Sequence, residues 1–532
     1  MDTKKITEMK NSTIRLQRYF LAILSALLLS FAFPPYHLGF MAFFGFVPIF
    51  YLLERVSAGA AFKWGYIWGV FFHIVNLYWI GTITILGAIA AILFLALYFA
   101  FFLYLAAIFR EHLGNKAIIW YPFLWLFIEF IRSLGVLGFP WASMGYTQTY
   151  YINFIQFATV TGVFGVSFWI LWINVCVYQL LKHWKNWRKS LLYGTVLAVL
   201  VFLPWIYGKL TIPNQEKIRE KIEVALIQGN IDPWAKWDEA FLARNFSIYD
   251  RMTRQVLRDS SVDLVIWPET ATACYLRSRP EYLKKIRNLV DSSRVGIVTG
   301  TPDYKFVGNG AYNSYNAIFL LLPGSRGIQY YYKRHLVPFG EKVPLSEKLP
   351  FLEKWLDAIQ TGVGDFTSGK DYNLFELPGT YLRERGITET KSGLLFAGVV
   401  CYESIFQDEV REFIKKGAQF LVIVTNDAWF GKSEAPYHHA QIAVFRAIEN
   451  RISVARCANT GVSMIIDPYG RILTKTKLFR QEIAKGRILV QSKKTFFTKH
   501  GDVFTYVVVG IVCAEIIWVL VKARLDKRQT AV

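Results

Sequence analysis

Long apolar segments fill the first 208 residues and return near the C-terminus. Apolar residues make up 54% of the chain and crowd before Gly208 and after Asp502. We place the segments at 18–33, 37–54, 63–81, 84–109, 117–133, 163–182, 190–207 and 503–522. About 20 apolar residues in a helix cross the hydrocarbon core of a bilayer, and the first two segments are near the lower limit. The pattern predicts eight membrane-spanning helices, seven before an aqueous domain and one after it.

The basic residues recur on alternate loops between these segments. Lysine and arginine precede the first segment and are absent around Pro34-Pro35, return at Arg55 and Lys63, and are absent again near Gly81. Cytoplasmic loops are enriched in lysine and arginine, so this alternation predicts that both termini are cytoplasmic. An odd number of spans then places the aqueous domain on the opposite side. The first segment lacks a small-residue cleavage pattern, so we expect it to remain as an anchor.

The formal net charge of +21 raises the question of a nucleic-acid partner. Many of the basic residues lie at the ends of apolar segments, where membrane topology accounts for them. The others suit a domain that works beside anionic lipid headgroups. We therefore predict the bilayer, and no nucleic acid, as the partner of these charges.

Three regions follow from the composition: a transmembrane bundle at 1–208, an aqueous domain at 209–501, and a final span with a cytoplasmic tail at 502–532. The aqueous domain alternates strand-like and helix-like runs, which predicts an α/β layered fold with helices on the sheet faces. We expect strands at 222–228, 262–267, 295–300, 316–322, 328–332, 394–400, 420–425, 453–457 and 462–467. We expect helices at 239–258, 281–292, 408–416 and 437–451.

A long stretch between Phe339 and Asn373 has weak periodicity and carries apolar side chains. Connections of that length are usually functional lids or disordered segments. We expect the part at 340–372 to act as a hydrophobic lid.

Three predicted strands end in residues that carry chemistry. The strand at 262–267 is followed by Glu269, the strand at 328–332 by Lys333, and the strand at 394–400 by Cys401. If these strands share a sheet, a carboxylate, an ammonium and a thiol meet at one rim. The carboxylate can accept the thiol proton, and the ammonium can lower the thiol pKa and stabilise an oxyanion. Together they suffice for acyl transfer.

The remaining polar candidates favour structural roles. His438 and His439 have no third ligand at a suitable spacing, so we expect neither a metal nor a cofactor. We interpret Asp365 and Asp427 as loop carboxylates. The sequence leaves open whether Cys274 and Cys457 form a disulfide.

Four polar residues lie within the apolar segments. Glu129 and Arg132 are spaced to pair at a helix end, or to help hold a lipid headgroup. For His73 and Asn76 we expect hydrogen bonds between helices.

Several motifs point to known families. Those of the aqueous domain are Trp267-Pro268-Glu269, 332–341, Cys401-Tyr402-Glu403-Ser404, 425–430 and 446–451. Others are Gln228-Gly229-Asn230, Lys236-Trp237, Tyr312-Asn313-Ser314 and 459–463. The aqueous domain resembles the nitrilase (carbon–nitrogen hydrolase) superfamily, and the whole chain is similar to the bacterial apolipoprotein N-acyltransferase family. This resemblance implies an αββα sandwich inserted into the helix bundle.

The resemblance also implies a site and a reaction. Glu269 would be the general base, Lys333 the oxyanion stabiliser and Cys401 the nucleophile. The further active-site positions are Glu341, Glu403, Tyr402, Trp237 and Asn313. We expect Glu341 and Glu403 to orient Lys333 or to hold its charge, and Trp237 and Asn313 to shape the pocket.

The expected reaction is a two-step acyl transfer. A phospholipid, typically phosphatidylethanolamine, would acylate Cys401, and the resulting thioester would N-acylate a diacylglyceryl-modified apolipoprotein. The setting would be the bacterial inner membrane, with the catalytic domain periplasmic and the enzyme a monomer.

Two alternatives stay open from the residues themselves. One is a membrane-tethered amidase of the same superfamily, in which water replaces the amine acceptor. The other is a transporter with an accessory domain, for which the spans offer only Glu129, Arg132 and His73 as polar candidates.

Overall fold

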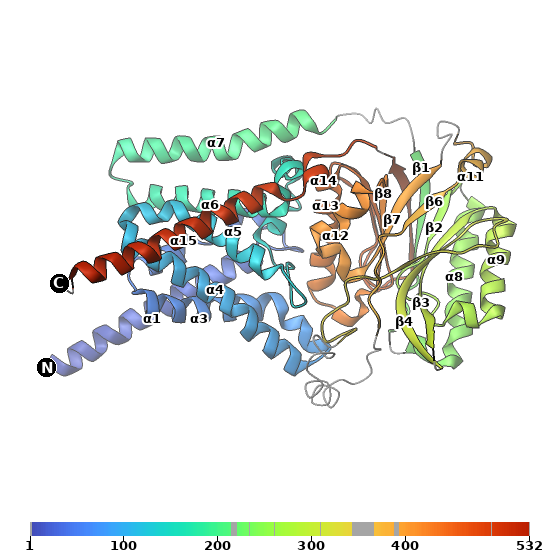
Figure 1. Cartoon of the computed structure of the whole chain (residues 1–532), viewed down its shortest axis with the longest axis horizontal. Coiled ribbons are helices and arrows are strands. Elements are labelled where there is room, and N and C mark those ends of the chain that lie inside the picture. Colours follow the sequence, from blue (N-terminus) through green and yellow to red (C-terminus); the bar gives the residue numbers. More distant parts are fainter. Residues whose placement is uncertain are drawn as a thin grey trace. The chain divides into compact units, whose positions relative to one another are not determined.

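The computed structural model describes residues 3–213, 221–233, 235–259, 261–308, 310–342, 366–387, 393–490 and 492–530. The chain divides into two compact units (Figure 1). The helical unit comprises residues 1–134, 138–212 and 502–532. The α/β unit comprises residues 135–137 and 213–501.

The helical unit is built from apolar helices joined by short turns. Its α-helices are α1 (Thr3–Phe31), α2 (Val47–Leu53), α3 (Ala58–Leu77), α4 (Ile85–Leu113), α5 (Tyr121–Arg132), α6 (Ala158–Lys182), α7 (Trp187–Thr211) and α15 (Val503–Thr530). Short 3₁₀-helices include η1 (Gly39–Phe43), η3 (Gly114–Trp120) and η4 (Met144–Gln148). Within the described residues, four helical stretches are long and apolar enough to cross a membrane: Ser12–Phe31, Ile85–Arg132, Ala158–Lys182 and Trp187–Thr211.

Two predicted spans are not single long helices. The segment at 37–54 folds as η1 followed by α2, which has 7 residues, and the segment at 117–133 as η3 followed by α5, which has 12. Each short α-helix has a proline in its first turn, Pro48 or Pro122. Proline is accepted there but cannot continue a helix that begins further upstream.

Helices α3 and α4 pack closely through small residues. A Cβ added at Gly65 would lie 2.8 Å from the Ala100 Cα, and one at Gly69 would lie 2.9 Å from the Ala96 Cα. Four-residue spacing of small residues lets two helix backbones approach, as is common between membrane helices. Apolar patterning alone does not reveal this contact, because glycine and alanine at these positions matter for their small volume.

The polar residues of the apolar segments are bonded within this unit. Asn76 on α3 donates to the Ser30 hydroxyl on α1 at 2.7 Å, so the expected hydrogen bond between helices is present. His73 Nδ1 contacts the Gly69 carbonyl at 2.7 Å, within its own helix. Glu129 accepts from the Trp125 indole at 2.9 Å and from the Met144 N–H at 2.8 Å.

The α/β unit contains two six-stranded sheets. The first has the order β12-β1-β2-β3-β4-β5 and the second β11-β10-β9-β8-β7-β6. The first sheet comprises β1 (Lys221–Gln228), β2 (Leu264–Ile266), β3 (Gly296–Gly308), β4 (Ala311–Leu321), β5 (Gln329–Tyr332) and β12 (Glu482–Leu489). The second comprises β6 (Leu374–Leu377), β7 (Leu394–Val400), β8 (Phe420–Thr425), β9 (Ser453–Ala458), β10 (Met464–Ile466) and β11 (Ile472–Lys475).

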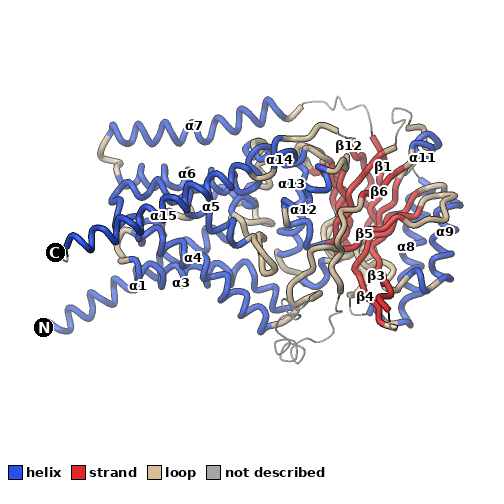
Figure 2. Tube along the Cα trace, in the orientation of Figure 1, coloured by secondary structure: helices blue, strands red, loops and turns tan. Residues whose placement is uncertain are grey.

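Helices cover the outer faces of both sheets, which makes an αββα sandwich (Figures 1 and 2). The longer helices are α8 (Glu239–Asp259), α9 (Pro280–Ser293), α12 (Gln407–Lys415) and α13 (Ala435–Asn450), and α11 (Gly379–Glu384) and α14 (Phe496–His500) are short. Strands β1, β2 and β3 pair in parallel, as do β7, β8 and β9. Strands buried on both faces read as continuous apolar runs, which is why the central strands were predictable.

The premise that the three strands with chemical ends share one sheet is wrong. Strands β2 and β5 belong to the first sheet and β7 to the second. The two sheets face each other, because a Cβ added at Gly398 of β7 would lie 2.9 Å from the Ile318 side chain of β4. The strand ends therefore meet across the sandwich and not along one rim.

Candidate active site

Glu269, Lys333 and Cys401 lie where strands end. Glu269 follows β2, Lys333 directly follows β5, and Cys401 begins the 3₁₀-helix η8 (Cys401–Ile405) directly after β7. All three side chains are buried. A helical turn directly after a buried strand projects a side chain at the strand's carboxyl end, where open sheets present chemistry.

Lys333 sits between two carboxylates. Its Nζ lies 2.7 Å from Glu341 Oε2 and 4.0 Å from Glu269 Oε1, and its side chain is 1% exposed. Burial alone would lower the pKa of Lys333, but Glu341 and Glu269 outweigh it and hold that pKa above its ordinary value. Lys333 is therefore a permanent ammonium, and Glu341 is the carboxylate that balances its charge.

Asn316 on β4 joins the two carboxylates. Its amide nitrogen donates to Glu269 Oε1 at 2.8 Å and to Glu341 Oε1 at 2.9 Å. Sequence reasoning missed this residue and named Asn313 instead. The dipeptide Tyr-Asn occurs twice within β4, at 312–313 and 315–316, and nothing in the local pattern favours one over the other.

Asn313 lies on the same strand three residues earlier. Side chains alternate between the faces of a strand, so Asn313 and Asn316 point to opposite faces. The pairing of β4 with β3 is regular from Asn313 to Asn316, which keeps that alternation intact. The structure thus brings Asn316, and not Asn313, to Glu269.

The end of β8 holds Glu269 and Cys401 together. The Asn426 N–H donates to Glu269 Oε2 at 2.8 Å. The hydroxyl of the preceding residue, Thr425, acts to lower the pKa of the Cys401 thiol, whereas Glu269 acts to raise it. The Glu269 carboxylate is therefore close enough to influence the Cys401 thiol, although the two residues follow strands of different sheets.

Cys401 has a backbone conformation that few non-glycine residues adopt. Its φ is 51°, in the left-handed region, at the junction of β7 with η8. Such strained positions persist where the surrounding structure enforces them, and they cluster at active sites. Burial and the neighbouring Glu269 raise the pKa of the Cys401 thiol, and Lys333 only partly opposes them. The thiol therefore keeps its proton at neutral pH until a base removes it.

Glu403 connects the two strand ends. It accepts hydrogen bonds from the Val400 N–H at 2.8 Å, from the Arg334 N–H at 2.6 Å and from the Tyr331 hydroxyl at 2.7 Å. Val400 precedes Cys401, and Arg334 follows Lys333. Among the described residues, Glu403 forms no ion pair with Lys333 within 4.0 Å, so its hydrogen bonds reach this part of the site through the backbone.

Tyr402 and Trp237 differ in their surroundings. Tyr402 is buried and packs edge-on against Phe406 at 5.2 Å between ring centroids. Trp237 is 47% exposed and lies 5.6 Å from the Lys236 ammonium.

Lys236 is buried and donates to the Thr270 hydroxyl and carbonyl, directly beside Glu269. Burial lowers the pKa of Lys236 to about 8, although Glu269 acts to raise it.

A buried polar network lies behind Cys401. Asp427 is bonded to His439 Nδ1 at 2.8 Å and to Arg456 at 2.8 Å, and His439 Nε2 lies 3.0 Å from the Ser404 hydroxyl. Sequence reasoning treated Asp427 as a loop carboxylate, whereas it is fully buried. Asp365 lies outside the described residues.

Cys401, Asp427 and His439 offer three ligand atoms within 4.8 Å of one another, a spacing that a metal ion could use. Both carboxylate oxygens of Asp427 already accept hydrogen bonds, from His439, Thr425 and Arg456. A guanidinium at 2.8 Å from this carboxylate also repels a cation. The donor set therefore does not fit a metal.

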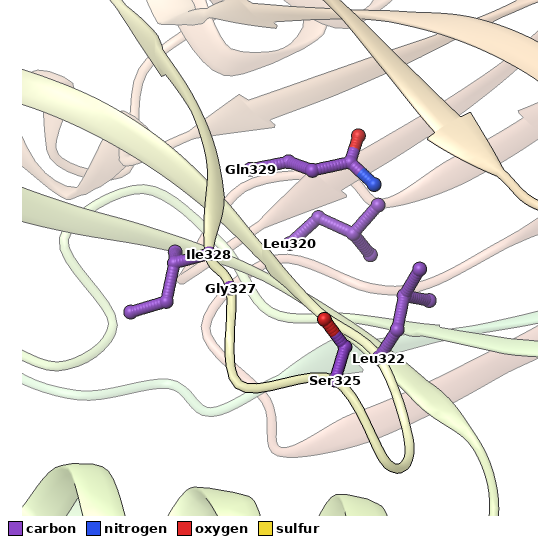
Figure 3. Close-up of a pocket in the computed structure, with 6 residues that line it drawn as sticks. All are labelled: Leu320, Leu322, Ser325, Gly327, Ile328 and Gln329. Carbon is purple, nitrogen blue, oxygen red and sulfur yellow. The ribbon is translucent and has the colours of Figure 1, made fainter.

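The cysteines and the surface hollow contribute nothing further to the site. Cys274 and Cys457 are both free, so they do not form a disulfide. A hollow of about 130 Å³ lies at the β4–β5 turn and is lined by Leu320, Leu322, Ser325, Gly327, Ile328 and Gln329 (Figure 3). It lies at the end of β5 opposite to Lys333.

Two family models match the chain. The apolipoprotein N-acyltransferase N-terminal domain matches residues 25–176, and the carbon–nitrogen hydrolase domain matches residues 223–493. The chain is also similar to a solved structure, Saccharomyces cerevisiae Nit3 of the nitrilase superfamily. That likeness has 19% identity and a TM-score of 0.36 and covers 52% of this chain and 93% of the other.

Bacterial relatives match over nearly the whole length. The apolipoprotein N-acyltransferase of Geobacter metallireducens is 34% identical over 527 residues, covering 96% of each chain. That of Chlorobaculum tepidum is 33% identical over 518 residues, covering 93% of this chain and 95% of the other. On these matches, which include both family domains in order, the chain belongs to the apolipoprotein N-acyltransferase family.

Proposed function

We propose that this acyltransferase transfers an acyl chain from a phospholipid, such as phosphatidylethanolamine, to the N-terminal amine of a diacylglyceryl-modified apolipoprotein. The observation that best supports this function is the cluster of a buried thiol, a buried ammonium and a carboxylate in a chain of this family. The apolar helices support membrane-embedded substrates. Holding both reactants at one site makes each chemical step effectively unimolecular.

In the first step, Cys401 Sγ attacks the ester carbonyl carbon of the phospholipid. Glu269 accepts the thiol proton, which the raised pKa of the thiol makes necessary. The Lys333 ammonium stabilises the tetrahedral oxyanion. The carbon–oxygen ester bond then breaks, Glu269 returns the proton to the departing hydroxyl, and a lysophospholipid leaves. The acyl chain remains on Cys401 as a thioester.

In the second step, the α-amino group of the acceptor cysteine attacks the thioester carbonyl. Glu269 accepts a proton from the amine, the carbon–sulfur bond breaks, and Glu269 passes that proton to the departing sulfur to restore the thiol. The product is an amide, and the enzyme returns to its starting state. Tyr402 and Trp237 are proposed supporting residues from the family resemblance, and Asn316 takes the place that the resemblance gave to Asn313. The lid expected at 340–372 falls largely outside the described residues.

We also propose the membrane arrangement. Residues 1–208 would cross the inner membrane seven times, with the passes at 37–54 and 117–133 each made of a 3₁₀-helix and a short α-helix. Residues 209–501 would form the periplasmic catalytic domain, and 502–532 the last span and a cytoplasmic tail. One chain carries all three proposed catalytic side chains, so a monomer suffices.

Mass spectrometry of the full-length protein tests the proposal. The enzyme is incubated in nanodiscs with phosphatidylethanolamine carrying a labelled acyl chain. We expect a labelled thioester on Cys401, absent from Cys401→Ala, which a diacylglyceryl lipopeptide discharges as labelled amide. Labelled transfer by Cys401→Ala would overturn the assignment of the nucleophile. Release of free fatty acid at the same rate with and without lipopeptide would instead indicate an amidase-like hydrolase.

A further inference from the structure

His439 on α13 sits directly behind the proposed nucleophile. Its Nε2 lies 3.1 Å from the Cys401 carbonyl and 3.0 Å from the Ser404 hydroxyl, and its Nδ1 lies 2.8 Å from Asp427 Oδ1. The side chains of His439 and Asp427 are 0% exposed. No step of the proposed reaction uses this histidine.

The hydrogen-bond partners assign its protonation state. The Cys401 carbonyl can only accept, and the Ser404 hydroxyl already donates to that carbonyl at 2.8 Å, so both groups require a proton on Nε2. The Asp427 carboxylate also only accepts, so Nδ1 needs a proton as well. Arg456 Nη2 lies within hydrogen-bond distance of Nδ1, at 3.1 Å, and donates to Asp427 Oδ2 at the shorter distance of 2.8 Å. A ring that donates from both nitrogens is an imidazolium.

The net charge of the groups around the thiol depends on whether His439 carries its second ring proton. A ring nitrogen of His439 and a carboxylate oxygen of Asp427 lie within 4.8 Å of Cys401 Sγ. Asp427 alone disfavours a thiolate and raises the pKa of Cys401. With Arg456 and a charged His439 the network carries one net positive charge, and with a neutral His439 it carries none. Buried charges at this distance interact strongly, because little water screens them.

We propose that His439 is a buried imidazolium, held by Asp427, which stabilises the Cys401 thiolate and fixes the backbone turn that presents it. The inference rests on the proposed function, since it assigns a positioning residue to the same nucleophile. His439 touches the backbone of Cys401 and no substrate. Its role is to place a second positive charge beside the Cys401 thiolate, in addition to that of Lys333.

The pH profile of Cys401 alkylation tests the charge. The full-length protein in nanodiscs is treated with iodoacetamide between pH 6 and 10, and modification of Cys401 is followed by mass spectrometry. His439→Gln keeps a hydrogen-bond donor but removes the charge. We expect alkylation of Cys401 at pH 7.5 to be about tenfold slower in this variant, because loss of the charge leaves a smaller fraction of the thiol ionised. His438→Gln, the same change one residue earlier on α13, is the matched control and should keep the profile of the unsubstituted protein.

Two further measurements separate charge from structure. Ser404→Ala removes a hydrogen-bond partner but no charge, so its profile should stay in place. In the unsubstituted protein, solid-state nuclear magnetic resonance of ring-¹⁵N-labelled histidine at pH 7.5 should show one ring with both nitrogens protonated. This second readout needs no variant to fold.

An unshifted profile in His439→Gln, or a neutral ring at pH 7.5, would overturn the inference. None of these readouts requires acyl transfer. A shifted profile in a protein that forms no thioester from phospholipid would leave this inference standing and overturn the proposed function.

Discussion

A single amide sets the distance between the two carboxylates around Lys333. Asn316 donates from one nitrogen to both Glu269 and Glu341, so removing it frees both side chains at once. We expect Asn316→Ala to slow thioester formation by about 10- to 100-fold, because small misplacements of catalytic groups are costly. The loss of two hydrogen bonds to charged groups should also lower the free energy of unfolding by about 1–3 kcal/mol. Single-turnover mass spectrometry and thermal unfolding measure the two effects.

The variant Asn313→Ala tests whether Asn313 belongs to the active site, as the family resemblance implies, or lies on the other face of β4. The resemblance assigns Asn313 to the site, whereas the alternation of side chains along β4 points it to the face opposite Asn316. The geometry therefore predicts near-normal thioester formation in Asn313→Ala. A loss as large as that in Asn316→Ala would contradict this interpretation of β4.

His335, two residues after Lys333, makes the α/β unit sensitive to acid. Burial first, and then Lys333 and Arg334, lower the pKa of His335 from 6.5 to about 4. An unfolded chain takes up this proton below pH 6.5 and the folded chain only near pH 4, so stability is full above pH 6.5 and falls as the pH drops. At pH 5.5 the loss is about 1 kcal/mol.

Thermal unfolding between pH 7.5 and 5.5 checks this pH dependence. His335→Gln should lose less stability over that interval than the unsubstituted protein, although its stability at pH 7.5 is lower because His335 stacks on Phe406 at 3.8 Å. His500→Gln, at an exposed histidine, is the control. Equal pH dependence in all three proteins would show that His335 does not carry the effect.

Which site residues the sequence could predict depends on whether they follow an element that can be recognised. Glu269, Lys333 and Cys401 each follow an apolar strand, and motif resemblance adds Glu341 and Glu403. Asn316 lies inside β4, and His439 lies on the buried face of α13. Polar residues within strands and helices resemble ordinary structural residues until their partners from distant parts of the chain are known.

At the scale of elements, Gly300 of β3 packs directly against the backbone of the loop that carries Glu269. No space remains at Gly300 for a side chain. A Cβ added at Gly300 would lie 2.5 Å from the Glu269 Cα and 2.6 Å from the Pro268 carbonyl oxygen. Both are backbone atoms, so Gly300→Ala must displace the loop. We expect thioester formation to fall by about 100-fold, because displacing the base by about 1 Å misaligns it with the thiol.

Gly327→Ala, in the turn between β4 and β5, is the matched control for Gly300→Ala. Its added Cβ would meet only the Ser325 hydroxyl, at 3.6 Å, beside the open hollow of Figure 3. It should form the thioester at the normal rate. A fully active Gly300→Ala enzyme would show that the loop of Glu269 can shift without cost.

The elements that the sequence missed have polar or short patterns. Strand β7 matched its predicted bounds because it is apolar throughout and ends at Cys401. Strands β6, β11 and β12 were missed because each is short or mixes apolar residues with charged ones, as in Glu482–Leu489. The division of the strands between two sheets was also unpredictable, since pairing between distant segments decides it.

At the scale of the whole molecule, α7 joins the helical unit to the α/β unit. It has 25 residues, and only 6% of its most apolar stretch is buried within the protein. An apolar helix exposed to this extent would be unstable in water, whereas lipid contact stabilises it. We therefore expect α7 to cross the membrane alone, with lipid around most of its surface.

Cysteine labelling across α7 tests that crossing and the side of the catalytic domain. Lys185 and Lys475, both exposed, lie before α7 and on β11 of the α/β unit, respectively. In spheroplasts, a membrane-impermeant maleimide should label Lys475→Cys at once and Lys185→Cys only after lysis, because the positive-inside rule places the basic loop around Lys185 in the cytoplasm. The unsubstituted protein gives the background from Cys274 and Cys513, its two cysteines that are not buried. Labelling of both positions before lysis would mean that α7 does not span the bilayer, and the reverse order would invert the proposed topology.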